Sequence, residues 1–230
     1  TGLLQMTNYI FDIDGTLTPS RLPIDKDFKK WFLNWCKNKD VYFVTGSNKD
    51  KTIEQIGIDM WLAARRVYQA CGNVVYQKGQ LVRSDDFEPS HKLHGFLCEL
   101  LEQSPWYGDY GNNIEKRIGL VNFSTIGRDC PQEKREEYFA NEKERVSYAK
   151  AIMDKFPHLE ACVGGQISID IYMRGKNKAQ ILNDISGYSV FFGDGCEDGN
   201  DAPLAERVDK AYQVSGWQET WDILKSLEEK

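Results

Sequence analysis

The first 60 residues place apolar side chains with two different periods, which predicts strands that alternate with helices. Residues 9–11 and 41–44 are short apolar runs, typical of buried strands. Residues 25–38 carry aromatic side chains at i, i+3, i+4 and i+7, the spacing of an amphipathic helix that Asp25 would cap. Residues 48–58 fit a second short helix. This alternation predicts a parallel sheet.

The pattern changes in the middle of the chain. A hairpin is predicted at residues 74–82, with its turn at Lys78-Gly79. The elements predicted next are helices at residues 90–104 and 141–156 and strands at residues 119–124 and 166–172. The inward-facing residues expected of the second helix and the second strand are Val146, Ala149, Met153 and Phe156, and Ile167, Ile169 and Ile171. Helices against strands with polar outer faces indicate an α+β lobe at residues 85–174.

The last part of the chain returns to the first pattern. The predicted elements are a helix at residues 178–185, strands at residues 189–192 and 211–214, and a final helix with Trp217, Trp221 and Leu224. The two ends of the chain, residues 1–84 and 175–230, are therefore expected to form one parallel-sheet core. The fold class is α/β, with the α+β lobe inserted into the core.

Two carboxylates, Asp12 and Asp14, stand where the first apolar strand gives way to Gly15. Open parallel sheets bind their ligands at the carboxyl ends of strands, so the pair lies where a site is expected. One carboxylate can be a covalent nucleophile, and the second can be a general acid/base, or both can hold Mg²⁺. Asp and Gly are also ordinary turn residues, but a charge that begins within an apolar run is costly without a function.

The segment Asp12-Ile13-Asp14-Gly15-Thr16 resembles the first motif of the haloacid dehalogenase (HAD) superfamily of phosphotransferases. Three further motifs match in order: a Thr or Ser that ends a strand, a Lys near a helix start and an acidic loop, found as Thr45 or Ser47, Lys176 or Lys178, and residues 191–201. Four motifs in the right order are hard to explain as unrelated turns. The resemblance implies a HAD-like Rossmannoid core, and a lobe inserted between the second and third motifs is that superfamily's larger, type C2, cap.

The lobe is similar to the cap of eukaryotic-type phosphomannomutases. Residues 117–128 follow that family's order of an Arg, a Gly and an Asn-x-Ser-x-Ile-Gly-Arg run, and residues 164–171 resemble its Gly-Gly-x-Ile-Ser-Phe-Asp-Val strand. The substrate-contacting positions that the resemblance implies are Arg21, Arg117, Arg128, Arg135, Ser168 and Asp170. Arg suits a phosphate because its planar guanidinium donates two parallel hydrogen bonds.

This resemblance implies a mutase that interconverts mannose 1-phosphate and mannose 6-phosphate, with a hexose 1,6-bisphosphate as activator. Asp12 would form an aspartyl-phosphate, and Asp14 would transfer the proton. Thr45 or Ser47 and Lys178 would complete the phosphate site. The family also forms dimers through the cap, and its product leads to GDP-mannose.

The resemblance further implies Mg²⁺ as the metal. Its ligands would be Asp12, the carbonyl group of Asp14, and Asp194, with support from either Asp198 or Asp201. The acidic loop is one residue shorter than the family's usual form, which leaves that last choice open.

Two other functions remain open at this point. A sugar-phosphate phosphatase on the same fold is favoured by two departures from the family: the shortened acidic loop and a Lys loop without the Trp-Asp-Lys ending. Thr45 in place of a family Gly moves the second motif toward the general superfamily form. A catalytically silent sugar-phosphate-binding protein is the third hypothesis. Intact Asp12 and Asp14 disfavour it, since a silent relative needs neither.

Composition narrows the partners. The chain has 230 residues, 41% of them hydrophobic, and a formal net charge of −6, which disfavours nucleic acid as a partner. The sequence shows no apolar run that could cross a bilayer and no signal-peptide pattern, so no membrane partner is expected. The six cysteines form no C-x-x-C pair, which predicts reduced thiols in a cytoplasm. Residues 1–5 are given no role.

Overall fold

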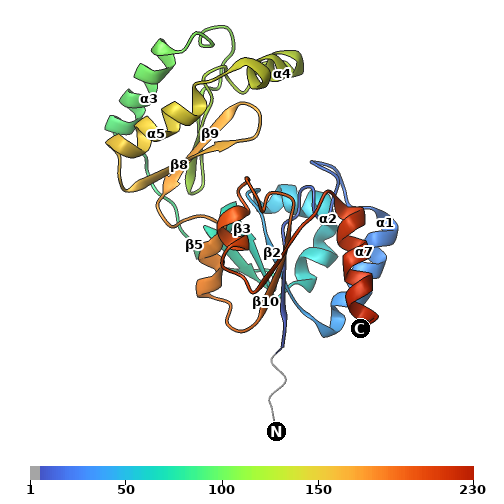
Figure 1. Ribbon diagram of the computed structural model, residues 1–230. Helices are drawn as coiled ribbons and strands as arrows, with labels where there is room; N and C mark the ends of the chain where they lie inside the picture. The colour runs from blue at the N-terminus through green and yellow to red at the C-terminus, as the bar shows by residue number, and fades with distance from the viewer. Residues whose placement is uncertain (1–5) are drawn as a thin grey trace. The chain divides into compact units, whose positions relative to one another are not determined.

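The structure is a computed structural model that describes residues 6–230, so residues 1–5 lie outside the described residues. The chain divides into two compact units, which are coloured by residue number in Figure 1. The first unit comprises the described residues up to Ser84 together with Lys176–Lys230, and the second comprises Asp85–Gly175. The boundaries predicted from the sequence lie at 84/85 and 174/175.

The first unit is built on a seven-stranded sheet of order β11-β10-β1-β2-β3-β4-β5. It is parallel from β11 to β3 and antiparallel at β4 and β5. The strands are β1 (Asn8–Phe11), β2 (Asp40–Val44), β3 (Arg66–Gln69), β4 (Val74–Gln77), β5 (Gln80–Ser84), β10 (Ser189–Gly193) and β11 (Lys210–Gln213). In β1, Phe11 pairs with Phe192 of β10 and Phe43 of β2, so distant parts of the sequence meet at the sheet centre.

Helices cover both faces of this sheet. One face carries α1 (Lys26–Trp35), α2 (Lys49–Ala63) and α7 (Trp217–Glu228), which Figure 1 shows on the same side. The other face carries the 3₁₀ segment η3 (Lys178–Asn183) and α6 (Ala202–Ala205). Two short 3₁₀ turns, η1 (Cys36–Asn38) and η2 (Ala70–Gly72), follow α1 and β3. The side chain of Asp25 accepts hydrogen bonds from the first amides of α1, which confirms the predicted N-cap.

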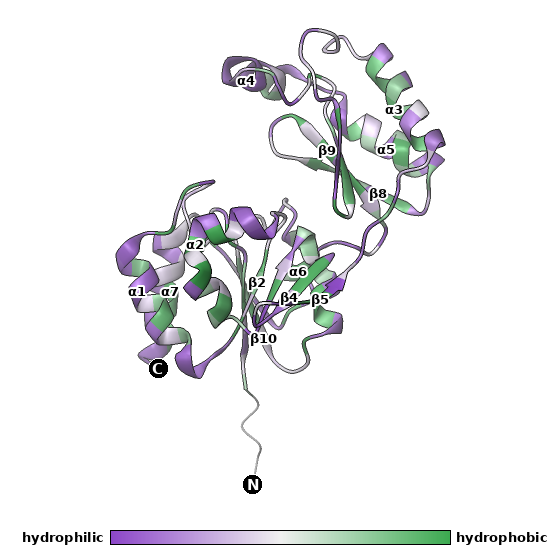
Figure 2. Cartoon of the chain, turned by 180° about the vertical axis from the view of Figure 1, so that it is seen from behind, coloured by the Kyte–Doolittle hydropathy of each residue, from purple (hydrophilic) through white to green (hydrophobic). Residues whose placement is uncertain are grey.

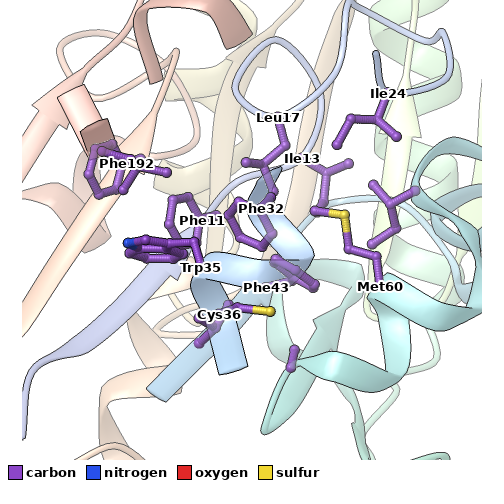
Figure 3. Close-up of a cluster of buried hydrophobic side chains, with 14 of the residues drawn as sticks. Phe11, Ile13, Leu17, Ile24, Phe32, Trp35, Cys36, Phe43, Met60 and Phe192 are labelled. Carbon is purple, nitrogen blue, oxygen red and sulfur yellow. The ribbon is translucent and has the colours of Figure 1, made fainter. Parts of the chain in front are cut away.

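Aromatic rings fill the space between the sheet and α1. Phe11 is fully buried and stacks on Phe192, with ring centroids 5.0 Å apart. Phe32 of α1 meets Phe11 edge-on at 5.2 Å, and Figure 3 shows these rings in one cluster with Trp35 and Phe43. Close packing of this kind fixes β1, so the loop that follows Phe11 leaves the sheet from a rigid position.

The second unit is a four-stranded antiparallel sheet of order β6-β7-β9-β8. Its elements are α3 (His91–Gln103), β6 (Ile114–Arg117), β7 (Leu120–Phe123), α4 (Gln132–Asn141), α5 (Arg145–Lys155), β8 (Leu159–Gly164) and β9 (Ser168–Met173). Figure 2 shows α3 and α5 together beside this sheet, each with hydrophobic residues among polar ones. Ile169 and Ile171 of β9 are buried in their shared core, as predicted. Ile167, predicted on the same face, precedes β9 and is buried in a separate cluster with Ile126 and Tyr138.

The helix predicted at residues 141–156 is wrong in its first part. Asn141 is the last residue of α4, and α5 begins only at Arg145. The side chain of Glu142 accepts a hydrogen bond from the amide of Arg145, which helps to start the new helix there. Val146, expected to face inward, is 76% exposed.

The predicted helix at residues 178–185 is also corrected. It forms η3, a 3₁₀ segment, because its backbone makes i→i+3 hydrogen bonds such as that from the amide of Asp184 to the carbonyl of Ile181. Strands β3, β6 and β8 and helices α4 and α6 were not predicted. Among residues 6–230, no helix combines the length and the apolar character needed to cross a membrane.

Candidate active site

Asp12 directly follows Phe11, the last residue of β1. Its amide donates to the carbonyl of Phe192 (3.0 Å), and the residue is only 5% exposed. The hydroxyl of Thr16, one turn later, lies 3.5 Å from the Oδ2 atom of Asp12. The backbone after β1 therefore holds one buried carboxylate at the carboxyl end of the central strand, where open α/β sheets bind ligands.

Lys178 is the positive partner of this carboxylate. Its Nζ atom lies 3.0 Å from Oδ1 of Asp12 and 2.6 Å from Oδ1 of Asp201, and its side chain is 1% exposed. Burial alone would lower the pKa of Lys178, but the carboxylates of Asp12 and Asp201 raise it above its usual value. Lys178 is therefore charged. Lys176, the alternative lysine predicted for the third motif, is half-buried.

Asp12, Asp194 and Asp201 form a carboxylate cluster, with one oxygen of each within 4.8 Å of the others. Burial raises the pKa of Asp12 well above its usual value, although Lys178 opposes the shift, and burial also raises the pKa of Asp194. Three carboxylates beside one ammonium leave an excess of negative charge. Oxygen donors of this kind fit Mg²⁺, so the chemistry of the cluster suits the metal that the resemblance implies.

Asp201 and Asp198 differ sharply in this loop. Asp201 is fully buried, and its Oδ2 atom accepts a hydrogen bond from the amide of Gly195 (3.0 Å) while its Oδ1 atom contacts Lys178. Asp198 is exposed and is not part of the cluster among the described residues. Asp201 thus holds both the acidic loop and the lysine.

Gly15 allows the acidic loop to approach the loop after β1. Its φ angle is +74°, a conformation that favours glycine, and a Cβ atom here would overlap the carboxylate of Asp194. The Gly in the first motif therefore has a geometric reason: it keeps Asp194 beside Asp12.

Thr45 and Ser47 follow β2, the neighbour of β1. Thr45 is 3% exposed, and its Oγ1 atom accepts a hydrogen bond from the amide of Ser47 (3.1 Å). The register of β1 and β2 pairs Phe11 with Phe43, so Asp12 and Thr45 both leave the sheet at its carboxyl edge. Either hydroxyl is at the edge that carries Asp12, and both remain candidates for the second motif.

Asp14 is held by two donors that meet at one oxygen. Its Oδ1 atom accepts hydrogen bonds from the backbone amide of Arg21 (2.7 Å) and from Nε2 of Gln55 (2.6 Å). Arg21 adopts φ +61° and is exposed. Gln55 was not among the predicted site residues, and the signal available for it was a polar residue on the buried face of a predicted helix.

Four residues on the polar face of the second unit form what we call the cap cluster: Asn122, Arg128, Ser168 and Asp170. The guanidinium of Arg128 donates to Oδ1 of Asn122 (3.1 Å) and to the hydroxyl of Ser168 (3.0 Å). The amide nitrogen of Asn122 donates to Asp170 (2.8 Å). Asn122 thus connects Arg128, Ser168 and Asp170, three positions predicted to contact the substrate. Asn122 itself was not predicted as a site residue.

Asp170 sits in the middle of this polar face. Its register partners are Asn122 on β7 and Cys162 on β8, and Asn122 in turn pairs with Glu115 on β6. Burial raises the pKa of Asp170, although the hydrogen bond from Asn122 and the charges of nearby arginines oppose the shift. Glu115, Asn122 and Asp170 therefore form a row of polar side chains across β6, β7 and β9.

Arg117 and Arg135 lie at the border of the cap cluster. Arg117 donates to Glu115 (2.6 Å), and this hydrogen bond lowers the pKa of Glu115. Arg135 donates to the backbone carbonyl of Arg128 (2.8 Å) and so supports the loop that carries it. Of the six predicted substrate positions, Arg21 lies in the first unit and the other five lie in the second.

Solved structures share this fold. The chain matches the Plasmodium falciparum IMP-nucleotidase with a TM-score of 0.67 at 17% identity, over 98% of this chain and 69% of that one. It matches a haloacid dehalogenase-like hydrolase from Bacteroides thetaiotaomicron with a TM-score of 0.62 at 9% identity, over 97% of this chain and 100% of that one. At these identities the likeness concerns the fold, which is the HAD-like α/β fold that the first motif indicated.

Sequence comparison identifies the family. A phosphomannomutase from Saccharomyces cerevisiae is 31% identical over 82% of this chain and 80% of its own length. Phosphomannomutase 1 of Dictyostelium discoideum is 29% identical over 98% of each chain, which includes the segment with Asp12 and Asp14. The family model described as eukaryotic phosphomannomutase matches residues 28–229. On its sequence, its fold and the arrangement of its carboxylates, the chain belongs to the eukaryotic phosphomannomutase family.

Proposed function

We propose that the protein interconverts mannose 1-phosphate and mannose 6-phosphate through an aspartyl-phosphate. The observation that carries the proposal is the buried contact of Lys178 with Asp12 in a chain of this family. The lysine favours an ionised Asp12, which is the form that can attack phosphorus. Relatives of this chain named phosphomannomutase support the choice of substrate.

The reaction proceeds in two transfers. In the first, Asp14 takes a proton from the free hydroxyl of the hexose monophosphate, whose oxygen bonds to the phosphorus of the aspartyl-phosphate as the bond from Asp12 to that phosphorus breaks. In the second, an oxygen of Asp12 bonds to the phosphorus of the original phosphate as its ester bond to the sugar breaks, and Asp14 gives the proton to the leaving sugar oxygen. The intermediate between the two transfers is a hexose 1,6-bisphosphate, which is why this compound would act as an activator.

The remaining groups of the first unit balance charge. Lys178 and the hydroxyl of Thr45 or Ser47 would contact phosphoryl oxygens. Asp12, the carbonyl group of Asp14, and Asp194 would hold Mg²⁺, with Asp201 supporting the loop. When bound, Mg²⁺ would neutralise charge on the phosphoryl group.

The second unit supplies the specificity in this proposal. The cap cluster, with Arg117 and Arg135, would bind the phosphate that is not reacting and the sugar hydroxyls. Arg21 would add a contact from the first unit. As in the family, we expect a homodimer formed through the cap and a product that enters GDP-mannose synthesis.

The test is a ³¹P NMR time course with the protein, Mg²⁺, mannose 1-phosphate and a trace of glucose 1,6-bisphosphate. We expect growth of the mannose 6-phosphate signal, dependent on the bisphosphate. Asp12→Asn is the matched control, because it keeps the shape of the side chain and removes the nucleophile. This variant should show no conversion.

Two other outcomes would overturn the proposal. Inorganic phosphate as the sole product would make the protein a sugar-phosphate phosphatase, with water as the acceptor. No change in any phosphorus signal would support a binding protein without catalysis. Unchanged conversion by Asp12→Asn would remove Asp12 from the mechanism.

A further inference from the structure

Gln55 places its side-chain amide against Asp14. It belongs to α2, is 4% exposed, and directs its Nε2 atom toward Oδ1 of Asp14 (2.6 Å) and the hydroxyl of Thr18 (3.3 Å). The orientation of the amide follows from these neighbours, because a rotated amide would set its oxygen against the carboxylate oxygen. Gln55 is therefore a fixed donor to Asp14.

The other atom of the same amide has no partner. Oε1 of Gln55 is buried and accepts no hydrogen bond from the residues that the structure describes. A buried polar atom without a partner costs free energy, which an apolar side chain of the same size at this position would avoid. The burial of Gln55 therefore needs a reason other than the stability of the fold.

The two donors on Asp14 leave its oxygens unequal. The amide of Arg21 (2.7 Å) and Nε2 of Gln55 both end on Oδ1. Two N–H donors occupy both lone-pair directions of an oxygen, so that oxygen cannot also carry the proton. When the carboxyl group is protonated, its proton is directed to Oδ2, the oxygen that neither donor uses.

Gln55 is also tied to the loop that it supports. Its backbone carbonyl accepts a hydrogen bond from the amide of Ile24 (2.9 Å), three residues after Arg21. Gly57 then interrupts α2 with φ +83°. The segment from Asp14 to Ile24 and the middle of α2 therefore form one connected unit around the carboxyl group.

We propose that Gln55 is a positioning residue that sets which oxygen of Asp14 exchanges the proton with the substrate. This inference rests on the proposed function, because it assigns a role in the same reaction. As the phosphorus–oxygen ester bond breaks and the bond to Asp12 forms, the proton on Oδ2 of Asp14 moves to the leaving sugar oxygen. Gln55 and the amide of Arg21 keep Oδ1 as the acceptor throughout.

The experiment compares two phosphoryl donors in Gln55→Met, which keeps the length of the side chain and removes the amide. A sugar hydroxyl is a poor leaving group that needs a proton, whereas p-nitrophenolate leaves without one. We expect kcat for mannose 1-phosphate to fall about 10- to 100-fold with little change in KM. The first turnover of p-nitrophenyl phosphate, measured with enzyme in excess, should stay within about twofold of the unmodified protein, since proton transfer contributes little to it.

Gln77→Met is the matched control. Gln77 is the last residue of β4 and lies at the edge of the sheet opposite to the one that carries Asp12, where its side chain accepts a hydrogen bond from Arg66. We expect normal rates with both donors. Gln55→Glu, which sets a carboxylate against Asp14, should repeat the selective loss.

Equal losses with both donors would make Gln55 a structural residue and overturn the proposal. Unchanged rates with both donors would overturn it as well. If the unmodified protein releases inorganic phosphate instead of mannose 6-phosphate, the mutase proposal fails, while the same comparison of donors still decides the role of Gln55. If the unmodified protein turns over neither donor, both the mutase proposal and the proposal for Gln55 fail.

Discussion

Lys178 shows how much the site depends on single charges. One buried ammonium contacts two carboxylates, and a third, Asp194, lies within reach of the same cluster. Burial raises the pKa of Asp12 and of Asp194 above the ordinary range. The two groups therefore hold protons at a pH at which an ordinary carboxyl group is ionised, and a cation must displace those protons to bind.

We predict that Mg²⁺ raises the melting temperature by an amount that depends on pH. The pKa values of Asp12 and Asp194 are raised. As the pH falls, protons therefore begin to compete with Mg²⁺ at a pH above about 4, the ordinary carboxyl pKa. The increase should be largest at neutral pH and should shrink as pH falls through the raised pKa values. Thermal unfolding with Mg²⁺ or EDTA, across pH 5–8, measures it.

Asp194→Asn is the control for this prediction. It removes one ligand charge and should abolish most of the Mg²⁺-dependent increase at every pH. A Mg²⁺ effect that is constant with pH, or unchanged in Asp194→Asn, would mean that the metal binds elsewhere.

At the scale of residues, the sequence indicates those that belong to a recurring local motif. Asp12 and Asp14 stand in a short pattern with Gly15, and the structure explains that glycine by the approach of Asp194. Gln55 and Asn122 have no such pattern. Their importance comes from partners that are distant in sequence, 41 residues in the case of Gln55 and Asp14, and only the folded chain brings those partners together.

Among the elements, α5 has a role beyond its apolar face. Arg145, in its first turn, is 4% exposed and donates to the carbonyls of Gly164, Gly165 and Ser168. It also pairs with Glu142 at 2.8 Å. The turn between β8 and β9 therefore depends on one side chain of a helix, and Ser168 of the cap cluster follows that turn.

We predict that Arg145→Met lowers the free energy of unfolding of the second unit by about 3–5 kcal/mol, because it leaves Glu142 and three carbonyls without their buried partner. Native-state hydrogen exchange of β8 and β9 measures the change. Lys150→Met is the control on the same helix. Its pair with Asp154 is exposed, and we expect a loss of under about 1 kcal/mol. Equal protection of β9 in both variants would contradict the prediction.

The elements that could be predicted are those with strong apolar periods. The strand at residues 189–192 and the final helix belong to this group. Strand β6, Ile-Glu-Lys-Arg, has one apolar residue and forms because β7 pairs with it, which no local pattern reveals. Val146 fitted the period of a helix that in fact starts later, so its face was misjudged.

For the whole molecule, the two units have separate cores. The buried hydrophobic residues of the second unit form a large cluster around Leu97, Phe123 and Ile171 and a smaller one around Tyr138, and both come only from residues between 85 and 175. A core contained in one continuous segment is a condition for independent folding. The first unit lacks this property, because β1 pairs with β10 from the other end of the sequence.

We therefore predict that a fragment of residues 85–175 folds by itself. Trp106 is its one tryptophan and packs on Tyr138 at 5.2 Å, so fluorescence can report its unfolding. We expect a single cooperative transition in urea. Ile171→Ala, at a fully buried position, should lower the free energy of unfolding by about 2–5 kcal/mol. A fragment without a cooperative transition would show that its core needs the rest of the chain.

The pairing of Asp12 with Lys178 has a consequence for synthesis on the ribosome. The two residues are 166 positions apart, so at 5–20 residues per second the nascent chain carries the Asp12 carboxylate for roughly 10–30 s before the matching ammonium exists. During that interval the central strand also lacks one of its two neighbours. The inserted segment can reach its folded form first, and the cluster of Asp12, Asp194 and Asp201 is among the last parts of the protein to be assembled.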